Sequence, residues 1–198
     1  MRTSGAASTR HATAASVRAF FALWPDRPAR DALATLASNV ARETEGRAPR
    51  TANFHLTVAF VGEVVARRVA ELHVVGKTAA GSTPPFLLTL DRVGGFRGSG
   101  IAWAGASVLP TALQRLAQQL ADGLAAGDFV IERRAFQAHV TLARRCRRPA
   151  KLTLEAPIEW DVTRLALVVS DLSTGAPHYR ELASWPLAGP IDKPGDAD

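Results

Sequence analysis

The sequence predicts an α+β fold with two lobes, and three observations support this prediction. Short apolar runs typical of strands alternate with amphipathic stretches typical of helices. Two of the strand-like runs carry the same His-x-Thr pattern, and each follows a predicted helix. The length of 198 residues suits one compact domain with a substantial core. We therefore expect a duplicated arrangement with the element order β-α-β-α-β-β-α-β-β-β-β.

Each element is predicted from its hydrophobic spacing and from the residues at its ends. The expected helices run from Asp26, as N-terminal cap, to about Glu45, from about Glu63 to Thr78, and from Pro110 to about 126. The expected strands are 17–23, 54–61, 86–93, 101–106, 138–143, 151–155, 162–170 and 178–183. Gly62 is expected to end the second strand. The glycine-rich stretch 94–100 is expected to be a loop between two strands, which argues against a dinucleotide-binding loop because such a loop opens a helix.

The two ends of the chain differ in composition from the rest. Residues 1–16 are rich in Ala, Ser and Thr without an acidic residue, and residues 188–198 are rich in Pro, Gly and Asp. We expect a disordered N-terminal extension over 1–16, one two-lobed domain over 17–187 and a flexible tail over 188–198.

Composition and charge indicate which kinds of partner the protein binds. The apolar runs are too short to span a membrane, and the single cysteine, Cys146, fits a reducing cytoplasm. The formal charge of +6 favours an anionic partner such as RNA. Arginines crowd the stretch 144–148, which fits either a phosphate-binding surface or a solvated loop. We expect a cytoplasmic monomer with no obligate protein partner.

The repeated motif is the most informative feature. "NFHLTVAF" at 53–60 and "QAHVTLAR" at 137–144 share the order His, aliphatic, Thr, aliphatic, Ala. Because strand side chains alternate between faces, His55 and Thr57 share one face, as do His139 and Thr141. A single such motif is typical of an ordinary strand. Two in matching context indicate a site.

Two facing histidines suit phosphodiester cleavage. An imidazole has an ordinary pKa near 6.5, so one ring can accept a proton while the other donates one. Threonine hydroxyls can donate hydrogen bonds to phosphate oxygens, and no metal or other cofactor is required. A metal-dependent hydrolase would need His55, His139 and further ligands such as His73, Asp91 or Cys146, but no HExxH or paired-Cys spacing is present. A non-catalytic nucleotide- or RNA-binding module and a phosphodiesterase of small cyclic nucleotides stay open as alternatives.

The same residues carry a family resemblance. "HLTVAFVGEV", "HVTLAR", "VRAFFAL" and "HYREL" resemble the two-histidine (2H) phosphoesterases, and within them the RNA 2′,3′-cyclic phosphodiesterases, also called 2′-5′ RNA ligases (LigT/ThpR). The resemblance covers about residues 17–187. It implies two pseudo-symmetric antiparallel sheets with outer helices and a central cleft. It also implies metal-independent hydrolysis of 2′,3′-cyclic phosphate ends of RNA to 2′-phosphates, with 2′-5′ ligation as a related activity.

The resemblance further implies roles for individual residues. His55 matches the proton donor to the leaving oxygen and His139 the proton acceptor from water. Phosphate-binding residues are matched by Thr57, Thr141 and Arg144, and cleft-lining aromatic residues by Phe20 and Tyr179. The chain departs from the family pattern at Ala48, Thr51, Ala52, Ala59, Gln137 and Ala138. Arg47 or Arg50, with Arg50 lining the cleft, is expected to compensate.

Overall fold

The computed structural model describes residues 16–96, 98–130, 136–150, 154, 156–171 and 178–189. The α-helices are α1 (Arg27–Glu43), α2 (Val69–Gly81) and α3 (Thr111–Ala126), with two short 3-10 helices, η1 (Thr51–Asn53) and η2 (Ala66–Arg68). The strands are β1 (Ser16–Leu23), β2 (Leu56–Val65), β3 (Phe86–Leu90), β4 (Arg92–Phe96), β5 (Ile101–Gly105), β6 (His139–Arg144), β7 (Ile158–Val162), β8 (Arg164–Asp171) and β9 (His178–Pro186). Within these ranges, no helix is long and apolar enough to cross a membrane.

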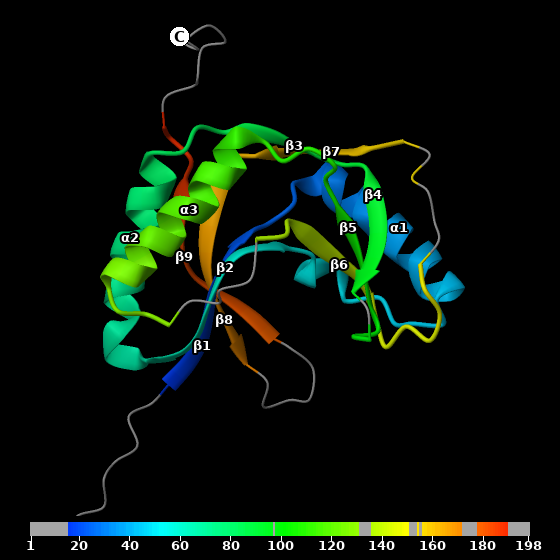
Figure 1. The fold of residues 1–198 in the computed structure, drawn as a ribbon, viewed down its shortest axis with the longest axis horizontal. Coiled ribbons are helices and arrows are strands. Elements are labelled where there is room, and N and C mark those ends of the chain that lie inside the picture. The colour runs from blue at the N-terminus through cyan, green and yellow to red at the C-terminus, as the bar shows by residue number, and fades with distance from the viewer. Residues whose placement is uncertain are drawn as a thin grey trace, which may run out of the picture.

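The strands form two antiparallel sheets. The larger sheet has the order β4-β5-β6-β2-β1-β8-β9, and the smaller sheet pairs β3 with β7. The larger sheet divides where β2 meets β6, because in the described part of the chain these strands share one register pair, Leu56 with Val140. Three strands therefore lie on one side of this junction and four on the other (Figure 1). The predicted α+β class with two antiparallel sheets is confirmed.

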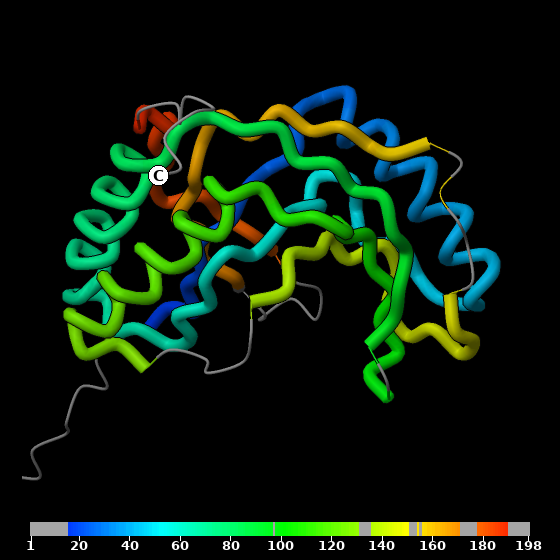
Figure 2. Tube along the Cα trace, turned by 45° about the horizontal axis from the view of Figure 1, so that its top comes forward, coloured from blue at the N-terminus to red at the C-terminus, as the bar shows by residue number. Residues whose placement is uncertain are grey.

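The helices cover the lobes in a crossed manner. Helix α1 leads into β2 but packs against β6 and β7, whereas α3 leads towards β6 but packs against β2 and α2. Figure 2 shows α2 and α3 at one end of the arched chain and α1 at the other. Each lobe is thus completed by a helix from the other half of the sequence.

Helix α1 shows how local chemistry sets an element. Asp26 has an extended backbone, and its carboxylate accepts a 2.8 Å hydrogen bond from the amide of Ala29, as an N-cap should. Leu33, Ala37 and Val40 recur at helical spacing and are buried. The predicted cap and apolar stripe are therefore confirmed, and the helix ends at Glu43.

The two faces of the larger sheet bury different clusters. The main core lies between the sheet and the helices and includes Phe21, Leu56 and Val140. A second, small cluster on the opposite face contains Phe20, Ala22, Ala166 and Val168, with Trp24, Phe60 and Tyr179 packed against it. Alternation along β1 sends Phe20 and Phe21 to opposite clusters. The small cluster forms the floor of the cleft described below.

Two predictions around Gly62 are wrong. β2 does not end there but continues to Val65, and α2 starts at Val69 instead of Glu63. Gly62 has φ +83°, and the register with β1 shifts between Ala19 and Phe20. Glycine adopts this left-handed conformation without strain, so it accommodates a β-bulge here.

The stretch 86–106 also differs from the prediction. The expected strand 86–93 is two strands: β3 pairs with β7 in the small sheet, and β4 pairs with β5 in the large one. Gly94 and Gly95, expected in a loop, lie in β4. Gly94 is required there because a Cβ atom would lie 2.4 Å from the Trp103 ring. The chain thus changes sheets at Asp91.

Near the C-terminus, one strand was not predicted. β7 buries Ile158, Trp160 and Val162 in strict alternation. The expected strand 151–155 lies almost wholly outside the described residues, and so do residues 1–15 and 190–198 of the expected extension and tail.

Candidate active site

The two His-x-Thr motifs lie on neighbouring strands at the junction of the lobes. His55 directly precedes β2, and His139 is the first residue of β6. Leu56 and Val140 are the register pair and both point into the main core. In an antiparallel pair, the preceding residue of one strand faces the following residue of the other. His55 therefore faces Thr141 and Thr57 faces His139, so the motifs are related by an approximate two-fold axis.

Both imidazoles are held by the same backbone contact. His55 Nδ1 lies 2.7 Å from the carbonyl oxygen of Asn53, and His139 Nδ1 lies 2.8 Å from that of Gln137. A carbonyl oxygen can only accept, so Nδ1 carries the hydrogen in each ring. The neutral ring then has a free electron pair on Nε2, and the charged ring has an N–H there. Each Nε2 can accept or donate a proton.

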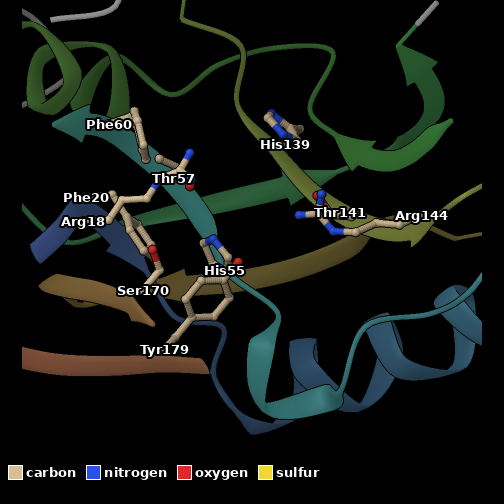
Figure 3. A pocket seen from close by; sticks show the side chains of 10 residues that line it. All are labelled: Arg18, Phe20, His55, Thr57, Phe60, His139, Thr141, Arg144, Ser170 and Tyr179. Carbon is tan, nitrogen blue, oxygen red and sulfur yellow. The ribbon is translucent and has the colours of Figure 1, made fainter. Parts of the chain in front are cut away.

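The four motif residues line one cleft of about 320 Å³. Its other lining residues are Arg18, Phe20, Phe60, Arg144, Ser170 and Tyr179. Figure 3 shows Arg144 on one side of the histidine pair and Arg18 with Phe60 on the other. The site therefore combines two imidazoles, two neighbouring hydroxyls and two flanking guanidinium groups.

Aromatic rings surround His55. The ring centroids of Phe20, Trp24 and Tyr179 lie 5.2, 5.5 and 4.9 Å from the imidazole centroid. His139 contacts Phe96 at 5.0 Å, edge to face. The two histidines thus share an anchor but differ in their apolar surroundings.

Burial and charge lower the pKa of both histidines. For His55, burial is the largest cause; the hydrogen bond to Asn53 opposes it, and the charges of Arg144 and His139 lower the pKa further. For His139, burial again comes first, the hydrogen bond to Gln137 opposes it, and Arg144 lowers the pKa further. The free protein therefore favours neutral imidazoles, the form that can accept a proton. The electrostatic influence of His139 on His55 reflects their proximity.

The structure also places the other residues considered from sequence. Phe20, Tyr179 and Arg144 line the cleft, whereas Arg50 is exposed at the start of η1, outside the cleft lining. Arg47 lies nearer, since its backbone forms two hydrogen bonds with that of Arg144, at 2.8 and 2.9 Å.

The alternative metal ligands are not assembled. His73, on α2, packs against Trp185, and Asp91 accepts hydrogen bonds from Ser107. Within the described part of the chain, no group of three or more His, Cys, Asp or Glu residues could hold a metal ion.

Three lining residues were missed from sequence. Arg18 precedes Phe20 by two positions, so strand alternation could have found it. Phe60 should face away from Thr57 by alternation, but register shifts in the β1–β2 pair bring it opposite Phe20. Ser170 reaches the cleft because β8 pairs with β1, which no local pattern shows.

Comparison with known proteins places this site in a family. The family model described as "2′-5′ RNA ligase superfamily" matches residues 24–174, which contain both motifs. The chain belongs to the 2′-5′ RNA ligase superfamily. The sequence resemblance to this family is confirmed, and with it the prediction that the chain is an enzyme.

Two bacterial proteins resemble the chain over most of its length. The RNA 2′,3′-cyclic phosphodiesterase of Escherichia coli is 32% identical over 145 residues, which are 72% of this chain and 80% of that protein. The protein of the same name from Geobacillus stearothermophilus is 27% identical over 150 residues, 71% of this chain and 47% of that protein.

Solved structures of similar proteins agree in fold. E. coli LigT complexed with 3′-AMP has a TM-score of 0.75 and 30% identity, covering 87% of this chain and 99% of that one. TT0787 of Thermus thermophilus has a TM-score of 0.74 and 28% identity, covering 87% of this chain and 98% of that one.

Proposed function

We propose that this protein is a metal-independent RNA 2′,3′-cyclic phosphodiesterase, which hydrolyses the cyclic phosphate at an RNA 3′ end to a 2′-phosphate. The observation that carries the proposal is the pair of anchored imidazoles, His55 and His139, in one cleft with a threonine beside each. Family membership and the names of the relatives support the same substrate class.

The proposed step needs one base and one acid. His139 Nε2, neutral, accepts a proton from water as the water oxygen bonds to phosphorus. The bond from phosphorus to the 3′-oxygen breaks, and protonated His55 donates its Nε2 hydrogen to that oxygen. The products are a 2′-phosphate and a 3′-hydroxyl. One proton enters the pair from water and one leaves it to the 3′-oxygen, so the net charge of the pair does not change. After the step His139 is protonated and His55 is neutral, and proton exchange with solvent restores the starting forms.

The remaining cleft residues suit the charge of the phosphate. Thr57, Thr141 and Arg144 all line the cleft. We expect the two hydroxyls to donate hydrogen bonds to the non-bridging oxygens and the guanidinium to supply a positive charge. In the free cleft, both histidine pKa values are lowered. A bound phosphodiester carries a negative charge, which favours the charged form of a nearby imidazole. Substrate binding therefore helps to supply the proton that the acid needs.

A non-catalytic binding module is less well supported. A site that only binds phosphate needs hydrogen-bond donors. It does not need two imidazoles that are each held through Nδ1 and so keep Nε2 free for proton transfer. Action on small cyclic nucleotides would use the same four residues, so substrate comparison distinguishes it.

The test is turnover in the presence of EDTA. We expect hydrolysis of an oligonucleotide ending in a 2′,3′-cyclic phosphate, monitored as conversion to the 2′-phosphate, and comparison with 2′,3′-cyclic mononucleotides and a 2′-5′ dinucleotide. Either His55→Ala or His139→Ala should lower turnover about 10²- to 10⁴-fold. His73→Ala removes an imidazole outside the cleft and serves as the matched control.

Two outcomes would oppose the proposal. Binding of the oligonucleotide without turnover would favour the binding module. Turnover that disappears with EDTA and returns with a divalent metal would contradict a metal-independent mechanism.

A further inference from the structure

We infer that Arg18 and Ser170 form a second anion subsite in the cleft, which binds the phosphate on the 5′ side of the terminal nucleotide. This inference rests on the proposed function, because it assumes that the terminal phosphate lies between the two histidines. It goes further by assigning the direction of the RNA strand and a preference for oligonucleotides over mononucleotides.

The subsite lies at the end of the cleft opposite Arg144 (Figure 3). Arg18 pairs in register with Ser170 on β8, and Ser170 pairs with Tyr179 on β9. Residues paired in register across antiparallel strands have side chains on the same face, with Cβ atoms about 5 Å apart. A guanidinium, a hydroxyl and an aromatic ring therefore follow one another across the sheet.

Arg18 is prepared for an external anion. Its guanidinium carbon lies 4.9 Å from the centroid of the Phe60 ring, a cation–π contact that holds the side chain in place. Other arginines are neutralised by neighbours: Arg68 pairs with Glu71 and Arg148 with Glu45. Glu63 on β2 is also a register partner of Arg18, but among the described residues no carboxylate forms an ion pair with the Arg18 guanidinium. Its N–H groups thus remain available for a phosphate.

The position of Arg18 fits the length of one nucleotide. Phe60, beneath the guanidinium, and Thr57 pair in register with Phe20 and Ala22 on β1, which are two residues apart, so about 7 Å of strand separates them. Thr57 belongs to the pair of motifs that would hold the terminal phosphate. The next phosphate along an RNA strand can therefore lie at Arg18 while the terminal ribose spans the cleft floor of Phe20 and Phe60.

The hollow beyond Tyr179 is less suitable for a phosphate. Its lining has three carboxylates, those of Asp26, Asp161 and Glu181, against two guanidinium groups, those of Arg30 and Arg164, and Arg164 already pairs with Glu181. Like charges would oppose the RNA backbone there.

The arginine-rich loop after Arg144 offers an alternative path for the RNA strand, and experiment can distinguish it from the path past Arg18. Arg145 and Arg147 are exposed beyond Arg144, outside the cleft lining. If the strand ran that way, Arg147 and not Arg18 would matter for longer substrates. Arg147→Gln removes the same charge as Arg18→Gln and is therefore the matched control.

The experiment compares a 2′,3′-cyclic mononucleotide with a dinucleotide ending in the same group, which adds one internal phosphate. For Arg18→Gln, we expect the kcat/KM of the dinucleotide to fall about 10- to 100-fold, as for loss of a hydrogen bond to a charged group. The mononucleotide should lose less than about threefold. Ser170→Ala should show the same selectivity with a smaller loss, and Arg147→Gln should affect both substrates equally and weakly.

A binding measurement makes the result independent of turnover. Isothermal titration calorimetry should show that Arg18→Gln binds the dinucleotide with a terminal 2′-phosphate more weakly than the parent does. Its affinity for the mononucleotide 2′-phosphate should stay unchanged. The slope of log affinity against log salt for the dinucleotide should decrease by about 0.7, the value for one phosphate contact on a single strand. Equal losses on both ligands, no loss on either, or a selective loss in Arg147→Gln would overturn the subsite. Failure of the parent protein to hydrolyse either substrate would instead contradict the proposed function.

Discussion

The two halves of the cleft present the same motif in different surroundings. In each half, a histidine donates Nδ1–H to the carbonyl two residues earlier, and a threonine follows on the same face. His55, on the four-stranded side, is enclosed by Phe20, Trp24 and Tyr179, whereas His139, on the three-stranded side, contacts Phe96. The hydrogen bonds that hold the two imidazoles obey the approximate two-fold axis, but the aromatic residues around the two rings do not.

This difference shows what a duplicated motif can and cannot specify. The backbone anchor fixes the tautomer, so both rings present Nε2 to the cleft with equal chemical capacity. The surroundings decide how readily each ring holds a proton. Assignment of acid and base therefore depends on the walls and on the position of the substrate, which break the symmetry.

The largest expected effect comes from removing each histidine. On the cyclic phosphate, His55→Ala and His139→Ala should each lower kcat about 10²- to 10⁴-fold. A 3′-deoxynucleoside 2′-(4-nitrophenyl phosphate) has a leaving group that needs little protonation. If His55 is the acid, His55→Ala should lose far less activity on this substrate than on the cyclic phosphate. The activity of His139→Ala should fall by a similar factor on the two substrates.

Release of nitrophenolate, followed by absorbance, gives the comparison directly. The reverse pattern would exchange the roles of the two histidines. Equal losses on both substrates in both variants would mean that neither ring protonates the leaving oxygen.

The threonines are expected to have the next largest effect. Thr57→Val and Thr141→Val keep the side-chain shape but remove the hydroxyl, and each should lower kcat about 10²-fold, the lower end for loss of one oxyanion donor. The corresponding serine variants should retain most of the activity because they keep the hydroxyl. Steady-state kinetics of all four variants test whether Thr57 and Thr141, which the approximate two-fold axis relates, contribute equally to phosphate binding. A loss below about threefold in one valine variant would mean that only the other hydroxyl contacts the phosphate.

Local patterns predicted the parts of the molecule that local interactions determine. The cap at Asp26 and the stripe of α1 follow from residues within four positions of one another. The same holds for the faces of His55 and His139, since alternation needs only the neighbouring residues.

The remaining features depend on pairings between distant segments. Gly62 looks like a strand breaker, but its positive φ serves a bulge that exists because β1 lies alongside. The run 86–93 looks like one strand, but its halves pair with different partners. Ser170 joins the cleft through the register of β8 with β1. Such pairings are set by the whole fold, so a sequence window does not contain them.

The smallest expected effects concern the walls around the two imidazoles. Burial lowers the pKa of both rings, and the enclosing aromatic residues exclude water from them. Tyr179→Ala should raise the pKa of His55 towards its ordinary value with little change at His139, and Phe96→Ala should do the opposite. Arg144→Gln should raise the pKa of both histidines because its charge acts on both. NMR titration of the imidazole ring protons measures each change separately.

The same shifts give a dependence of stability on pH with a definite sign. Because the folded-state pKa values lie below that of an unfolded histidine, near 6.5, the unfolded chain binds more protons in acid. The contribution of these residues to the free energy of unfolding is therefore full above about pH 6.5 and falls as the pH drops towards the folded-state values. Arg144→Gln raises the folded-state pKa values, so it should reduce the fall in the free energy of unfolding between pH 7.5 and pH 5. Denaturant unfolding at the two pH values measures this difference. An unchanged or larger acid loss in that variant, with NMR showing both pKa values raised, would mean that other groups dominate the acid sensitivity. Arg147→Gln removes the same charge outside the cleft lining and should leave the difference as it is in the parent.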